Sequence, residues 1–157
     1  MKASLLRILL APLLILFVAA SFAVDMSSPP ANDKLSAARA KIAAKDFPGA
    51  VEELKRVSDP ANADWNNLMG YSLRKAGAAN AAESERYYNE ALRIDPKHKG
   101  ALEYSGELYL MMDNLPMAEQ RLAALNKVCF LPCSEEKDLK NAVAKYKANG
   151  NKYVGDW

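Results

Sequence analysis

The sequence predicts an all-α protein, a helical solenoid of about three helix–turn–helix repeats followed by a C-terminal capping helix. Three observations lead to this prediction. Residue classes recur at a step of 34 positions, and apolar residues follow the 3.6-residue period of amphipathic helices. Prolines also fall regularly between the expected helices, since Pro60, Pro96 and Pro132 lie 36 residues apart. Fixed periods of this length are typical of repeat proteins.

The start of the chain, residues 1–23, has the composition of a secretory signal peptide. Lys2 and Arg7 supply positive charge, a charge-free run follows, and Ser21 and Ala23 are the small residues of a cleavage site. This pattern predicts a periplasmic or secreted protein. The alternative is an uncleaved N-terminal membrane anchor facing the periplasm, for which the apolar run is rather short.

Removing this leader changes the charge of the protein. The full chain has 21 basic and 19 acidic residues, and Lys2 and Arg7 account for its formal charge of +2. The remaining chain is therefore close to neutral, with charges of both signs dispersed along it. A neutral domain argues against electrostatic binding to nucleic acid. We also expect no membrane contact after cleavage.

The boundaries of the helical domain follow from composition. Residues 24–32 are rich in Ser, Pro and Ala and predict a disordered linker. The helical repeats and the cap then occupy residues 33–149, enough for one hydrophobic core, and a tail follows at 150–157. Asn32 or Asp33 is placed to cap the first helix.

The second helix of two repeats starts with the same local signal. Asp46 precedes Pro48, and 68 residues later Asn114 precedes Pro116. Asp and Asn accept hydrogen bonds from free N–H groups at a helix start, and proline fits the first turn. The positions that recur at steps of 34 residues are Ala50, Ser84 and Ala118, then Leu54, Tyr88 and Leu122, then Val57, Ala91 and Leu125.

The first helix of the middle and last repeats carries an apolar stripe at spacings of three and four residues. Gly70 and Gly106 interrupt these helices at a cost of roughly 1 kcal/mol each against alanine. Close approach of a neighbouring helix offsets such a cost, so we expect both glycines at helix contacts. The stripes consist of Trp65, Leu68, Met69, Ser72 and Leu73, then Ala101, Leu102, Ser105, Leu108, Tyr109 and Met112.

These segments resemble tetratricopeptide repeats, whose pattern is W-x-x-L-G-x-x-Y, then A-x-x-x-F, then P, over 34 residues. The first repeat is degenerate, with Ala38 in place of the glycine, and the middle turn at 76–82 is two residues longer than the pattern. The resemblance implies a small secreted bacterial protein of this family. The matching positions are Leu102, Ser105, Gly106, Tyr109, Ala118 and Leu122 in the last repeat, and Gly70, Leu73, Ser84, Tyr88 and Pro96 in the middle one.

The C-terminal segment predicts a capping helix. Ser134 is placed to cap its start, Glu135 and Glu136 suit its first turn, and Gly150 ends it. One face is apolar and the other carries lysines, as expected for the last helix of a solenoid. The apolar face consists of Leu139, Ala142, Val143 and Tyr146, and Tyr153 and Trp157 in the tail are free to fold back onto it.

Cys129 and Cys133 are the only cysteines, four positions apart around Pro132. In an oxidising compartment this spacing predicts a structural disulfide that fixes the turn into the capping helix. The alternative is a thiol- or metal-handling accessory protein that uses the two cysteines. Further soft or imidazole ligands for such a metal are Met111, Met112, Met117 and His98.

No pattern in the chain predicts catalysis. His98 is the single histidine, and no serine or cysteine nucleophile is paired with it by recognised logic. No glycine-rich phosphate loop is present. We therefore expect a protein without enzymatic activity and without a cofactor.

The resemblance to tetratricopeptide repeats implies a concave groove lined by the first helix of each repeat, which binds a protein or peptide partner. Such a protein acts as a non-catalytic scaffold or adaptor in the periplasm or cell envelope. The alternative is that these side chains are ordinary exposed residues. The expected groove residues are Arg39, Asn67, Tyr71, Arg74, Lys75, Glu103, Glu107, Leu110 and Met111.

Overall fold

The computed structural model describes residues 33–153. Within that range the chain forms seven α-helices and one short 3₁₀ helix and no β-strand, so the prediction of an all-α fold is confirmed. The predicted signal peptide and linker, and Trp157, lie outside the described residues. The helices are α1 (Ser36–Ala43), α2 (Phe47–Val57), α3 (Ala63–Ala76), η1 (Ala78–Asn80), α4 (Ala81–Ile94), α5 (Lys99–Met111), α6 (Leu115–Val128) and α7 (Ser134–Ala148).

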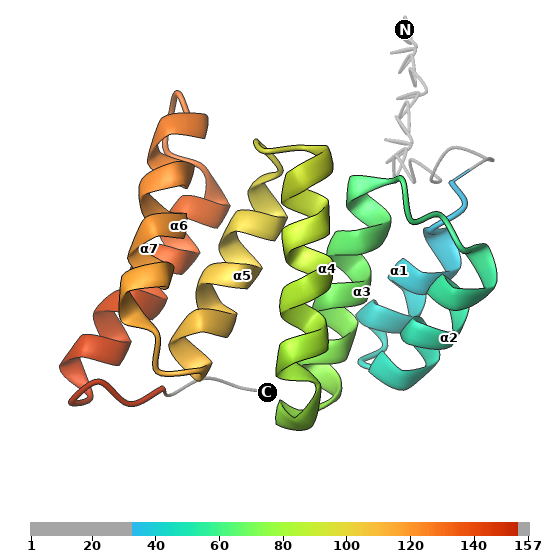
Figure 1. Ribbon diagram of the computed structural model, residues 1–157, viewed down its shortest axis with the longest axis horizontal. Coiled ribbons are helices and arrows are strands. Elements are labelled where there is room, and N and C mark those ends of the chain that lie inside the picture. The colour runs from blue at the N-terminus through green and yellow to red at the C-terminus, as the bar shows by residue number, and fades with distance from the viewer. Residues whose placement is uncertain (1–32, 154–157) are drawn as a thin grey trace, which may run out of the picture.

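The helices form two layers in a single row (Figure 1). Helices α1, α3, α5 and α7 make the inner layer, in which each helix contacts the next. Helices α2, α4 and α6 make the outer layer, where no helix contacts another of the same layer. The outer helices therefore contact only helices of the inner layer, apart from the contact of α4 with η1. None of the helices described here is long and apolar enough to cross a bilayer.

The capping signals of the sequence hold at α2 and α6 and fail at α1 and α7. Asp46 Oδ1 accepts the Gly49 N–H at 3.0 Å, and Asn114 Oδ1 accepts the Met117 N–H at 3.3 Å.

The prediction that Asp33 caps the first helix is wrong, because the N-cap of α1 is Leu35 and no side chain caps that end. Asp33 Oδ1 accepts the Leu35 N–H at 2.9 Å instead, and Asn32 lies outside the described residues. The prediction that Ser134 caps α7 is wrong. Ser134 is the first residue inside the helix, and no side chain caps that end.

The two mid-helix glycines lie at close helix contacts, as predicted. A Cβ on Gly70 would come within 2.8 Å of the Tyr88 ring, and a Cβ on Gly106 within 2.5 Å of Leu139 Cδ2. Ser84 Oγ also donates to the Gly70 carbonyl oxygen at 2.6 Å. The glycines therefore let α4 approach α3, and α7 approach α5.

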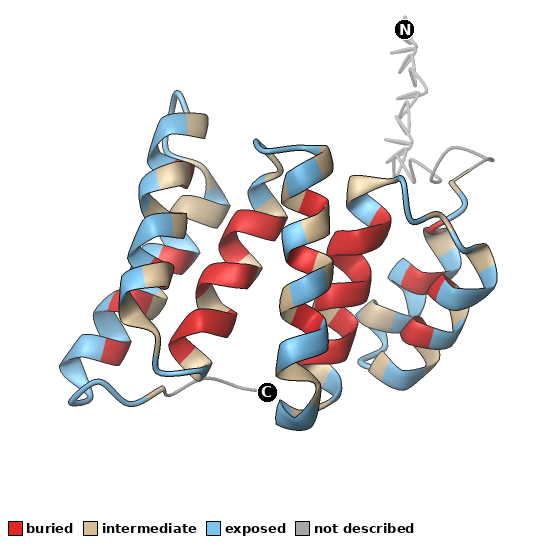
Figure 2. Cartoon of the chain, in the orientation of Figure 1, coloured by how far each residue is buried: buried red, intermediate tan, exposed pale blue. Residues whose placement is uncertain are grey.

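Burial follows the predicted repeat (Figure 2). The three small residues at the 34-residue step, Ala50, Ser84 and Ala118, are all 0% exposed. Both predicted apolar stripes are buried, except at Met112. Helix α5 ends at Met111, so Met112 leaves the helical stripe and is 42% exposed.

The longer middle turn forms the short helix η1 between α3 and α4. Gly77 precedes it with φ of 145°, a conformation that favours glycine. Asn80 Nδ2 then donates to the Leu73 carbonyl oxygen at 3.1 Å, which ties the turn to the end of α3. The extra residues are thus absorbed outside the two flanking helices.

The last helix covers the C-terminal end of the core. Leu139, Val143 and Tyr146 of α7 are buried against α5 and α6, and Tyr153 of the tail packs onto the same cluster. The cysteine sulfurs of the preceding loop are bonded, so this loop is closed at the start of α7. These contacts agree with the predicted capping role.

Candidate functional site

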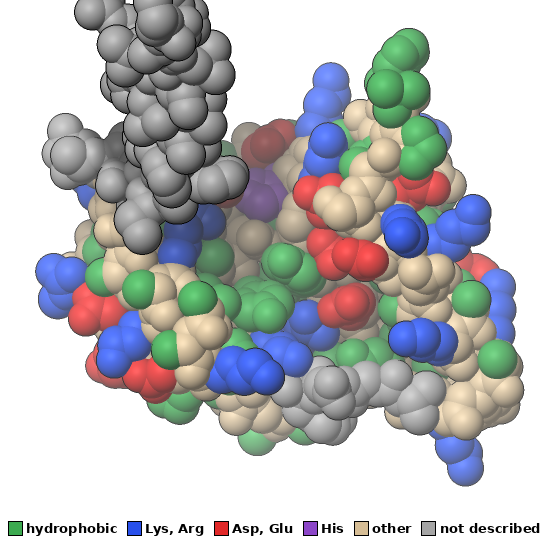
Figure 3. Space-filling model, turned by 180° about the vertical axis from the view of Figure 1, so that it is seen from behind, with side chains coloured by type: hydrophobic (Ala, Val, Ile, Leu, Met, Phe, Trp, Pro, Cys, Tyr) green, Lys and Arg blue, Asp and Glu red, His purple; other side chains and the backbone are tan. Residues whose placement is uncertain are grey.

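A groove runs along the inner layer, on the face shown in Figure 3. It consists of two adjoining cavities of about 430 and 460 Å³. The cavities share Tyr71 of α3, Glu103 and Tyr104 of α5, and Asp138 of α7. The hollow is therefore continuous from α1 to α7.

Most residues predicted for the groove do line it. The groove-lining residues among them are Arg39, Asn67, Tyr71, Arg74, Lys75, Glu103 and Glu107. Met111 lies behind the groove, where its Sδ is 3.7 Å from Arg74 Nη1.

Leu110 was predicted to line the groove, and this is wrong because its side chain is 0% exposed. It belongs to the cluster that joins α5 to α7. Leu110 occupies the position in α5 that Arg74 occupies in α3, four residues after the helix-contact glycine. That position faces the next inner helix, so both side chains are buried.

Helix α7 also lines the groove, although its sequence pattern predicts only a capping role. Glu135, Asp138, Asn141 and Lys145 lie along one wall, opposite α3. In the sequence, these polar and charged residues indicate only the solvent-exposed side of a terminal helix. The spacing of three and four residues between them was the available signal, since it places them on one stripe.

Arg74 is the most connected side chain of the groove. It is 4% exposed, and its Nη2 lies 2.8 Å from Glu107 Oε2. Its guanidinium also lies over the rings of Tyr71 and Tyr104, at 5.6 and 5.8 Å from their centroids. Such contacts stabilise a desolvated arginine. The charge of Arg74 is therefore neutralised within the protein.

Glu103, one turn before Glu107 on α5, has a different environment. It is 8% exposed and makes no hydrogen bond or ion pair with the residues described. Burial raises the pKa of its carboxyl to about 8, and the neighbouring acids Glu107, Asp138 and Glu135 add to this effect. Near neutral pH the groove thus holds a carboxyl that takes up or releases a proton easily.

Asn67 of α3 adds a second buried polar group to the same cavity. It is 7% exposed, and its Oδ1 has no hydrogen-bond partner in the described chain. Its Nδ2 is 3.2 Å from the place where a Cβ on Gly100 would lie. The missing side chain at Gly100 therefore makes room for the Asn67 amide.

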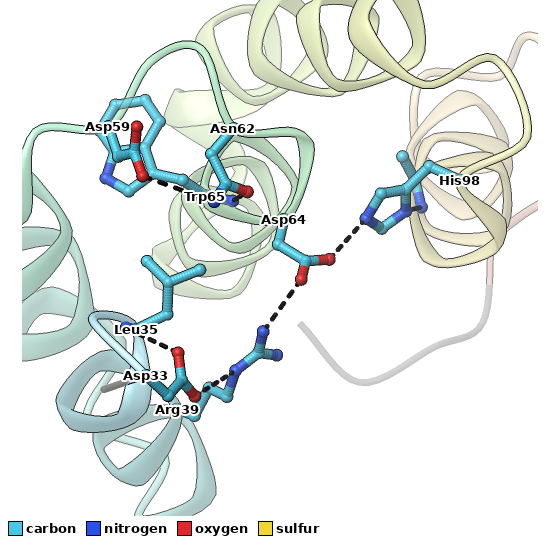
Figure 4. A network of polar contacts seen from close by, with 9 residues as sticks. Asp33, Leu35, Arg39, Asp59, Asn62, Asp64, Trp65 and His98 are labelled. Carbon is cyan, nitrogen blue, oxygen red and sulfur yellow. Dashed lines mark hydrogen bonds and ion pairs between the residues drawn. The ribbon is translucent and has the colours of Figure 1, made fainter. Parts of the chain in front are cut away.

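One end of the groove is held by a polar network from three helices (Figure 4). His98 Nδ1 accepts the Ala101 N–H at 3.1 Å, and its Nε2 lies 2.9 Å from Asp64 Oδ1. Asp64 Oδ2 in turn contacts Arg39 Nη2 at 3.3 Å, and Arg39 Nε contacts Asp33 at 3.5 Å. With Nδ1 accepting a backbone N–H, the Nε2 proton points to Asp64.

This network gives His98 a structural role. Its side chain is only 13% exposed, and it caps α5. Both ring nitrogens are engaged, so neither is directed at a cysteine or methionine. Among residues 33–153, no three His, Cys, Asp or Glu side chains gather closely enough to hold a metal ion.

Comparison with known proteins adds no assignment to this geometry. No protein-family model matches the chain, and no curated protein matches it significantly. The function must therefore be inferred from the groove itself.

Proposed function

We propose that this protein is a tetratricopeptide-repeat solenoid that binds an extended peptide or protein segment in its inner groove. In this proposal it acts as a non-catalytic adaptor in the periplasm or cell envelope. The proposal has three parts, namely the repeat, the groove and the compartment, and each is supported by a separate observation.

The repeat is supported by equivalent packing at equivalent positions. Gly70 and Gly106, 36 residues apart, both lie at close contacts, and the small residues at the 34-residue step are all buried. The alternation of inner and outer helices is also the arrangement expected of stacked helix pairs.

The observation that carries the binding function is the composition of the groove. It combines aromatic faces with buried polar groups that have no partner in the described chain, namely Glu103 and the Oδ1 of Asn67. Buried polar groups without a partner cost free energy, usually about 1–3 kcal/mol each. Binding sites accept such costs because a ligand supplies the missing partner.

The compartment is supported by the bond between Cys129 and Cys133, since disulfides persist in oxidising environments. Export through cleavage near Ala23 remains a prediction of the sequence. N-terminal sequencing of the exported protein tests it, and the expected first residue is Val24. An intact Lys2 on exported protein would favour the anchor instead.

Site-specific photo-crosslinking tests the binding function directly. A benzophenone amino acid replaces Asn141, on the groove wall of α7, or Tyr104, on its floor. The matched control replaces Glu83, which is exposed on the outer helix α4. Crosslinks to the same partner from both groove positions and not from Glu83 are expected. Crosslinks mainly from Glu83, or from no position, would reject the groove as the binding surface.

A further inference from the structure

We propose that the part of the groove between α5 and α7 recognises a cationic side chain, an Arg or Lys of the bound segment. The residues that would hold it are Glu103, Glu135 and Asp138, with Asn67 opposite. This inference rests on the proposed peptide-binding function and names the chemical class of its ligand.

The first argument is a surplus of carboxylates in the 460 Å³ cavity. Asp64 is paired with Arg39 and His98, and Glu107 in the adjoining cavity is paired with Arg74. Glu103, Glu135 and Asp138 have no such partner in the described part of the chain, and Figure 3 shows acidic side chains gathered on this side of the hollow. A surplus of negative charge attracts a cation.

The second argument is the kind of hydrogen bond that is missing. Glu103 and Asn67 come from different helices, both are more than nine-tenths buried, and both line the same cavity. Neither the Glu103 carboxylate nor the Asn67 Oδ1 has a hydrogen-bond partner in the described chain. Acceptors require a donor, and guanidinium and ammonium groups carry several N–H donors and no acceptor. An uncharged donor would leave the carboxylate charge without compensation.

Arg74 does not cancel this preference, although it lies nearby. Its charge is balanced by Glu107 at 2.8 Å, and its guanidinium lies over the rings of Tyr71 and Tyr104. Since its side chain is only 4% exposed, an anionic ligand could not reach it without displacing these contacts. Among the described residues, the remaining cation in the 460 Å³ cavity is Arg39, which is already paired with Asp33 and Asp64. Glu103, Glu135 and Asp138 are therefore in excess there. Lys75 and Lys145 line the adjoining cavity.

The titration of Glu103 gives this proposal a specific signature. Its pKa is raised to about 8 by burial and by neighbouring acids, so most of the free protein holds the proton at pH 7. A bound cation favours the ionised carboxylate, and the proton then leaves to solvent. The charged or titratable groups that face this part of the groove are Arg39 from α1, Asp64, Tyr71, Arg74 and Lys75 from α3, His98, Tyr104 and Glu107 from α5 and its cap, and Glu135, Asp138 and Lys145 from α7.

The test uses fluorescein-labelled hexapeptide libraries in which one central position is fixed and the others are mixed. The fixed residue is Arg, Lys, Glu or citrulline, the last being an uncharged analogue of arginine. Fluorescence polarisation with the full exported chain gives the affinity. We expect the Arg or Lys library to bind at least tenfold more tightly than the citrulline library. The reason is that one hydrogen bond to a charged group changes the affinity by about this factor.

Variants then assign the preference to the site. Glu103→Gln should weaken binding of the preferred library about tenfold or more, whereas Glu83→Gln, the same charge change on the outer layer, should leave it unchanged. Binding to the unaltered protein should strengthen between pH 6 and pH 8, with proton release in calorimetry. Glu103→Gln should abolish both effects. Thermal melts show whether each variant is folded, and Asp138→Asn, at an exposed position, provides a second variant that keeps the core intact.

The outcomes separate this inference from the function on which it rests. If all four libraries bind with equal affinity and a groove variant loses this binding, the cation preference is wrong and peptide binding in the groove stands. Binding of none of them would reject both. Full competition by spermidine or arginine amide at concentrations that match the peptide would show that a free amine, and not a peptide side chain, is the ligand.

Discussion

Charged side chains are placed and paired differently in the inner and outer layers of this protein. The outer helices carry exposed ion pairs between residues three positions apart in one helix, whereas the pairs within the inner layer join separate helices and one of them is buried. The outer pairs are Lys55–Glu52, Arg56–Glu53 and Arg93–Glu90. The inner pairs are Arg39–Asp64, which is exposed, and Arg74–Glu107, in which the arginine is buried, and Glu103 is left unpaired.

The exposed pairs and the buried charges differ in how much they contribute to the free energy of folding. Exposed pairs within one helix contribute little to stability, and their partners are found in the local sequence. Buried charges are costly unless they are paired, and this is the reason for proposing the inner face as the binding surface. The following changes test that contrast, beginning with the largest expected effect.

Replacing Arg74 by Met should give the largest loss of stability. It leaves Glu107 partly buried beside Glu103 without a cation, and breaking a pair of this kind costs about 2–4 kcal/mol. Chemical denaturation measures the loss. The matched outer change, Arg93→Met, should have no measurable effect. Equal losses in the two variants would remove the contrast between the layers.

Replacing Gly106 by Leu should destabilise the contact between α5 and α7. A Cβ there already comes within 2.5 Å of Leu139, and overpacking typically costs about 1–3 kcal/mol. A thermal melt checks this, and adding Leu139→Ala should recover part of the loss by making room. An unchanged melting temperature would show that the inner helices do not pack as closely as described.

Glu103 should make stability depend on pH. Its folded-state pKa of about 8 lies above the ordinary value of 4.5, so the folded protein holds the extra proton between these limits. Stability should therefore fall as pH rises from about 4.5 to 8. The fall would be about 5 kcal/mol for a fully desolvated carboxyl, and we expect about 2 kcal/mol because solvent in the groove screens the charge. In Glu103→Gln this fall should be absent. The two denaturation curves should coincide at pH 4.5 and separate by pH 8.5, and parallel curves would contradict the burial of a carboxyl.

Reduction of the bond between Cys129 and Cys133 should have a smaller and local effect. A bridge across so short a loop contributes about 1–2 kcal/mol, and it restricts only the entry to α7. Hydrogen exchange should show faster opening in Ser134–Ala148 and little change in α1 to α4. Binding of the preferred peptide library by the double Cys→Ser variant is expected to persist. Loss of binding in a folded variant would instead support a thiol- or metal-handling role.

The smallest effect is expected in the outer layer, for Glu90→Gln. Glu90 is bonded to Arg93 within α4, and this contact lowers the pKa of its carboxyl. Since both side chains are solvated, water replaces the lost contact. The melting temperature and the affinity for the peptide libraries should both stay as they are. A clear loss of either would give the outer layer a role that its geometry does not indicate.

The sequence by itself determined where the helices lie and which faces they bury. The capping residues Asp46 and Asn114, the glycines at 70 and 106, and the 34-residue step all act within one or two helices. Signals of this kind depend on neighbours along the chain, so they can be read before the fold is known. Seven of the nine expected groove residues were found for the same reason, since they follow the helical period.

Only the tertiary structure decided which groove side chains are buried, which are paired and which ones α7 adds. Leu110 is buried because α7 packs over it, and the same packing brings Glu135 and Asp138 to face Glu103. The pairing of Arg74 with Glu107, and of His98 with Asp64, joins residues 33 and 34 positions apart. The free energy of a charge depends on its solvent exposure and on its nearest partners. Both are set by how separate helices meet, and no local pattern in the sequence contains that information.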